Sequence, residues 1–171
     1  MKAVCPCNIF RSAREYWKQK RERTGYAVIE QDTVRLLREC DAGAKMGISS
    51  IEDVLGHVRA EALETLLADC KREHEKLRTE IQELLTRYRD EGKAPPALAS
   101  VMSELTTKIK LALHDSDEAI ADLMTKGCDM GVKSLSRYLN QYAAADEASK
   151  EIAKQLIKLE ETLAADIRPY L

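Results

Sequence analysis

The amino-acid sequence predicts an all-α protein, a four-helix bundle of two helical hairpins joined by a long crossover that contains a short helix. Three observations support this prediction. Aromatic residues make up only 5% of the 171 residues and charged residues 33%, a balance typical of helical bundles. Apolar residues recur at steps of three and four along four long segments. A six-residue pattern also occurs twice, at 40–45 and 128–133, within two of those segments.

The first predicted hairpin consists of helices over 32–56 and 60–90. Asp32 is the expected N-cap of the first helix, and Gly92 is the expected stop after the second. Because the connection between them is short, the two helices should pack antiparallel. The second helix carries an apolar stripe at helical spacing, formed by Leu63, Leu67, Cys70, His74, Leu77, Ile81, Leu84 and Tyr88.

The second predicted hairpin follows a proline-containing break at 91–96. Pro96 can open a short helix over 97–113, because proline is tolerated in a first helical turn. A helix over 117–143 then begins with two acidic residues that suit the positive end of its dipole. The last helix, over 147–168, has Asp146 as its N-cap and ends before Pro169.

The repeated pattern is Cys-Asp-x-Gly-x-Lys, and its two copies lie 88 positions apart. With an offset of 86 the second helices of the two hairpins also align, which predicts a pseudo-twofold relation between the hairpins. Gly43 and Gly131 should then let two helices approach closely, which would offset the roughly 1 kcal/mol that glycine costs inside a helix. The Asp and Lys of each copy fit either a functional pair or an ion pair on a solvated helix face.

Residues 1–31 form a basic N-terminal extension with seven Lys or Arg against three Asp or Glu, whereas residues 32–171 hold 20 against 26. We predict that this extension is poorly ordered and separate from the bundle over 32–171. Alternatively, Phe10, Tyr16 and Trp17 form the apolar face of an amphipathic helix that contacts a membrane surface or an acidic partner.

No run of about 18 apolar residues and no secretory signal occurs in the sequence. Its five cysteines are an odd number without the spacing of a disulfide scaffold. These features predict a soluble, cytoplasmic protein with reduced thiols. The chain contains neither a glycine-rich phosphate loop nor a Gly-x-Ser-x-Gly sequence, so no motif indicates an enzyme.

Two hairpins joined by a long crossover have the connectivity of ferritin-like bundles. The stretches LLRECDAGAKMGISSIEDVL, ADCKREHEKLRTEI and IADLMTKGCDMGVKSLSRYLNQY resemble a group of uncharacterised bacterial ferritin-like proteins, including ones from anaerobic Firmicutes. The resemblance covers residues 32–171. It implies the fold but no activity.

A ferritin-like di-iron centre requires a Glu-x-x-His motif on each of two helices. None of the three histidines follows a glutamate at that spacing, so a standard di-iron centre is not expected. Cys70 and His74, one turn apart, can nevertheless chelate zinc or iron, with Cys40 and Cys128 as further ligands from the first and third main helices. Alternatively, all four are core residues, in which case His74→Leu should be tolerated.

Two functional hypotheses follow from these patterns. The first is a non-enzymatic bundle that acts through association, as a homo-oligomer or with another protein, and for which nucleic acid is not an expected partner. The second is a metal-binding or redox protein that uses Cys and His ligands in the bundle core.

Overall fold

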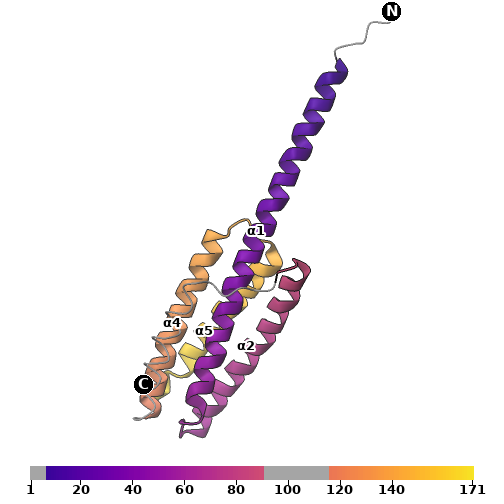
Figure 1. Cartoon of the computed structure of the whole chain (residues 1–171). Coiled ribbons are helices and arrows are strands. Elements are labelled where there is room, and N and C mark those ends of the chain that lie inside the picture. Colours follow the sequence, from indigo (N-terminus) through magenta and orange to yellow (C-terminus); the bar gives the residue numbers. More distant parts are fainter. Residues whose placement is uncertain (1–6, 91–115) are drawn as a thin grey trace, which may run out of the picture.

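The fold is all-α, as described by a computed structural model for residues 7–90 and 116–171. Four helices pack against one another, and no strand occurs within the described residues (Figure 1). None of the described helices has a stretch apolar enough to cross a membrane. The elements are α1 (Cys7–Leu55), α2 (Glu61–Arg87), α4 (Asp117–Gln141), α5 (Glu147–Asp166) and the 3-10 helix η1 (Arg168–Tyr170).

Three of the four long helices lie where the sequence predicts them. The hydroxyl of Ser116 accepts a hydrogen bond from the Ala119 amide at the start of α4, at 3.3 Å. At the start of α5, the Asp146 carboxylate accepts one from the Ser149 amide at 2.8 Å, which confirms the predicted N-cap. The short helix predicted over 97–113 lies outside the described residues.

The predicted start of the first helix at Asp32 is wrong, because α1 begins at Cys7 and continues through Asp32. No proline interrupts residues 7–31, and a single glycine weakens a helix by only about 1 kcal/mol. Asp32 instead accepts a hydrogen bond from the Ala144 amide at 3.2 Å, and Thr33 accepts one from the Asp146 amide at 2.9 Å. Asp32 therefore marks where the bundle begins. The separate, poorly ordered unit over 1–31 remains a prediction.

Contacts at the two ends of the bundle define its connectivity. At the end from which α1 projects, Arg38 of α1 donates to Asp90, which follows α2, at 2.9 Å. At the opposite end, the carboxylate of Asp117 at the start of α4 accepts hydrogen bonds from the Arg59 and Ala60 amides at 2.8 and 2.9 Å. The chain between α2 and α4 therefore joins opposite ends of the bundle.

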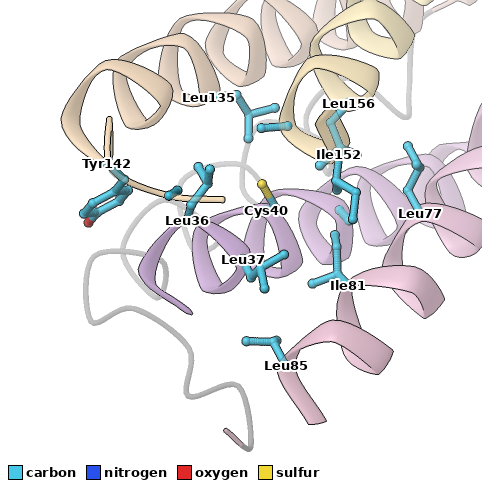
Figure 2. Packing of buried hydrophobic residues seen from close by; sticks show 13 residues of the cluster. Leu36, Leu37, Cys40, Leu77, Ile81, Leu85, Leu135, Tyr142, Ile152 and Leu156 are labelled. Carbon is cyan, nitrogen blue, oxygen red and sulfur yellow. The ribbon is translucent and has the colours of Figure 1, made fainter. Parts of the chain in front are cut away.

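The core consists of two apolar clusters, one above the other along the bundle. The arm-side cluster, nearer the projecting part of α1, draws side chains from all four long helices (Figure 2). Its larger members are Leu36, Leu37, Cys40, Leu77, Ile81, Leu85, Leu135, Tyr142, Ile152 and Leu156. The far cluster contains Ile51, Val54, Leu63, Leu67, Cys70, Ile120, Leu123, Met124, Cys128, Leu163 and Ile167. The predicted stripe of α2 is thus largely confirmed, with Leu85 buried where Leu84 was expected.

Candidate functional site

Four polar or sulfur-containing side chains meet where the two apolar clusters adjoin. We call Cys70 and His74 of α2, Cys128 of α4 and Glu160 of α5 the central polar group. His74 lies between the arm-side and far-cluster residues of α2, and its side chain is only 1% exposed. Glu160 has the same position along α5, and its side chain is 13% exposed. Burial makes the partners of both side chains decisive for stability.

Both ring nitrogens of His74 have a hydrogen-bond partner. Nδ1 lies 3.0 Å from the backbone carbonyl oxygen of Cys70, and Nε2 lies 3.1 Å from Oε1 of Glu160. A carbonyl can only accept, so Nδ1 carries a proton and donates it. Nε2 then either donates to an ionised Glu160 or accepts from a protonated one. The pair of His74 and Glu160 holds the same number of protons in both arrangements. That number is one more than in a neutral imidazole beside an ionised carboxylate.

The electrostatics of the group agree with this proton count. Burial lowers the pKa of His74, but hydrogen bonds to the side chains of Cys70 and Glu160 and the negative charge of Glu160 outweigh burial and raise the pKa to about 10. Burial also raises the pKa of the Cys128 thiol, and the nearby Glu160 carboxylate raises it further. Cys128 is therefore a neutral thiol at physiological pH, and only a thiolate is a good nucleophile or metal ligand.

Two glycines, one on α1 and one on α4, face the pair of His74 and Glu160. A β-carbon added to Gly47 of α1 would lie 2.8 Å from Nε2 of His74. One added to Gly131 of α4 would lie 3.3 Å from Oε1 of Glu160. A close approach at Gly131 was expected, but the same expectation for Gly43 is wrong, since a β-carbon there would have no neighbour within 4 Å. Four residues turn a helix by about 400°, so Gly43 and Gly47 point in directions roughly 40° apart.

The two copies of the repeated pattern have different surroundings. In the first copy Asp41 is buried, pairs with Lys45 at 2.5 Å and accepts a hydrogen bond from Gln82 at 2.7 Å. In the second copy Asp129 and Lys133 are both exposed. The pattern is thus a buried network between α1 and α2 in one place and a solvated helix face in the other.

The four residues predicted as metal ligands do not all come together. Cys40 packs in the arm-side cluster, where burial, then the charges of Glu39 and Asp41, raise its pKa to about 12. Cys70, with its Sγ 3.5 Å from Nδ1 of His74, and Cys128 belong to the far cluster. Within the described residues, no three His, Cys, Asp or Glu side chains are arranged to hold a metal ion. Metal binding by this set remains a prediction.

Glu160 is the member of the group that the sequence patterns did not identify. A signal was present, because Glu160 lies 86 positions after His74, and 86 is the offset at which the second helices of the hairpins align. Extending the predicted alignment to His74 pairs it with Glu160. The twofold relation between the hairpins itself remains a prediction.

Comparison of the chain with family models, curated proteins and solved structures finds no match in any of the three. The resemblance to ferritin-like proteins therefore remains an interpretation of the sequence. The geometry of the described residues is the basis for the functional proposals below.

The His74 pKa predicts how stability depends on pH. An unfolded histidine titrates near 6.5, so between about pH 6.5 and 10 the native state holds a proton that the unfolded state has released. The stabilisation is complete below pH 6.5 and is lost as pH rises toward 10. We expect the free energy of unfolding to fall by roughly 1–3 kcal/mol between pH 7 and 9.5. Urea unfolding at several pH values measures this slope, and a His74→Leu/Glu160→Leu variant should lack it. An equal slope in both proteins would contradict the assignment.

Proposed function

We propose that this chain is a ferritin-like helical bundle that acts through association rather than catalysis and without a standard di-iron centre. The length of α1 carries the proposal. This helix has 49 residues, and the part before Asp32 projects beyond the other helices (Figure 1). We call residues 7–31 the arm, which at 1.5 Å per residue is about 37 Å long. Most helices in proteins owe their stability to packing of an apolar face, so a projecting helix of this length favours a binding partner.

The ferritin-like part of the proposal rests on connectivity. In ferritin-like bundles, two antiparallel hairpins are joined by one long crossover. The connection between α2 and α4 joins opposite ends of this bundle, as the contacts of Asp90 and Asp117 require. The resemblance of residues 32–171 to ferritin-like proteins supports the same arrangement.

The central polar group supports a role in packing. Cys70, His74 and Glu160 have the order of a thiol nucleophile, a base and an orienting carboxylate. However, Nδ1 of His74 donates to the Cys70 carbonyl, and Cys70 and His74 are both buried. A substrate would have to open the core to reach the thiol.

Deletion of residues 1–28 tests the proposed function. We expect the intact chain to form an assembly and the shortened chain to be a monomer, with the helicity of the remaining bundle unchanged because the bundle begins at Asp32. Light scattering after size-exclusion chromatography measures the masses, and circular dichroism monitors the fold. If both proteins have the same number of chains per particle, and the shortened chain has lost no partner, association through the arm is contradicted.

Metal binding is the second candidate function, because Sγ of Cys70 lies 3.5 Å from Nδ1 of His74 and an i, i+4 pair of this kind can supply two ligands. Elemental analysis of untagged protein tests it directly. If the group packs the core, zinc and iron should stay well below one equivalent per chain. Stoichiometric metal that is lost in both His74→Leu and Cys128→Ala would instead establish the metal-binding function, because each variant removes one ligand.

A further inference from the structure

Charge is distributed unevenly between the two ends of the molecule. The arm holds six Lys or Arg against three Asp or Glu. At the opposite end of the bundle, α1 and α5 end while α2 and α4 begin, and among the described residues the exposed cations there are Arg59 and Arg168. The exposed carboxylates of the described residues at that end, which we call the acidic end, belong to Glu52, Asp53, Glu61, Glu64, Glu118 and Asp166.

These two regions cannot meet within one chain. The arm projects away from the bundle, and the acidic end lies at the far side of it (Figure 1). Opposite charges on distant parts of an elongated molecule can, however, be complementary between two molecules. The arm is also an unsuitable partner for a second arm, because both carry the same net positive charge.

The dimensions favour a reciprocal arrangement. The arm is about 37 Å long, and residues 32–55, the part of α1 within the bundle, span about 36 Å at the same rise per residue. If two chains meet antiparallel at the bases of their arms, each arm therefore runs along the partner's bundle. At 1.5 Å per residue, Arg11, Arg14 and Lys18 lie about 20 Å or more from the base of the arm, so they reach the half of the partner's bundle that carries the acidic end.

We infer that the arm binds the acidic end of a second copy of this chain, forming a twofold dimer in which the contact occurs twice. The inference rests on the proposed function, for which it names the partner. Val28 and Ile29, at the base of the arm, are 45% and 41% exposed in the single chain. Both lie where the two copies meet, so dimerisation would bury apolar surface as well as pair charges.

Charge reversal in the full-length chain tests this partner. One variant reverses the arm with Arg14→Glu, Lys18→Glu and Arg21→Glu. The other reverses the acidic end with Asp53→Lys, Glu64→Lys and Asp166→Lys. We expect the parent chain to be a dimer in sedimentation equilibrium, and its dissociation constant to rise at least tenfold between 50 and 500 mM salt. Each variant alone should be a monomer, with its dissociation constant raised at least 100-fold.

An equimolar mixture of the two variants is the decisive measurement. In the mixed dimer, a negative arm meets a positive end and a positive arm meets a negative end, so both contacts are restored. We expect a one-to-one heterodimer. A mixture that stays monomeric, or an arm variant that still dimerises, would overturn the inference.

The same proteins separate failure of this inference from failure of the proposed function. A monomeric parent chain that binds phosphatidylserine vesicles, and loses that binding in the arm variant, would overturn the second copy as partner. Association through the arm would then stand, with a membrane as the partner. If deletion of residues 1–28 changes neither the oligomeric state nor vesicle binding, both the inference and the proposed function are wrong.

Discussion

His74→Leu is expected to destabilise the protein by about 3–5 kcal/mol, since it removes one partner of a buried, hydrogen-bonded pair of ionisable side chains. The leucine leaves the Glu160 carboxylate in the core without its hydrogen-bond donor. From the sequence alone, where His74 has no identified partner, the substitution is expected to be tolerated. Because His74 contacts Glu160 in the structure, the substitution is expected to destabilise the protein instead.

The double variant His74→Leu/Glu160→Leu is the matched control for this effect. It removes both ionisable side chains and fills the space with apolar ones, so its stability should return to within about 1 kcal/mol of the parent, or exceed it. Urea unfolding of the parent, the two single variants and the double variant at pH 7 gives the coupling between the residues. Additive effects of the two single substitutions would show that the residues do not stabilise each other.

Gly47→Ala is expected to destabilise the protein by about 1–3 kcal/mol, although alanine is the better helix former. The added β-carbon would lie 2.8 Å from Nε2 of His74. The ring cannot move away freely, because both of its nitrogens are engaged by Cys70 and Glu160.

Gly43→Ala, one turn earlier in the same helix, provides the control for Gly47→Ala. A β-carbon at Gly43 meets no atom within 4 Å, so this substitution should stabilise by up to about 1 kcal/mol. Thermal unfolding followed by circular dichroism should therefore shift in opposite directions for the two variants. A rise in melting temperature for both would mean that His74 adjusts without cost.

Features that depend on neighbours in the chain could be predicted from the sequence. The positions of α2, α4 and α5 follow from apolar spacing, and the cap at Asp146 follows from its side-chain chemistry. The start of α1 could not be predicted in this way. Asp32 has the side chain of an N-cap, but the connection between α4 and α5 provides it with another donor, the Ala144 amide.

The candidate site depended on tertiary structure more than the helices did. The sequence by itself determined that His74 would face the core, because it stands in the apolar stripe of α2. Only the packing of α5 against α2 decided that its partner is Glu160, and only the register of α1 decided that Gly47 rather than Gly43 lies against its ring. The face of a helix that a residue occupies follows from helical spacing, which depends only on interactions between residues up to four positions apart. The partner on that face depends on rotation and translation between helices, which the side chains of the whole core set together.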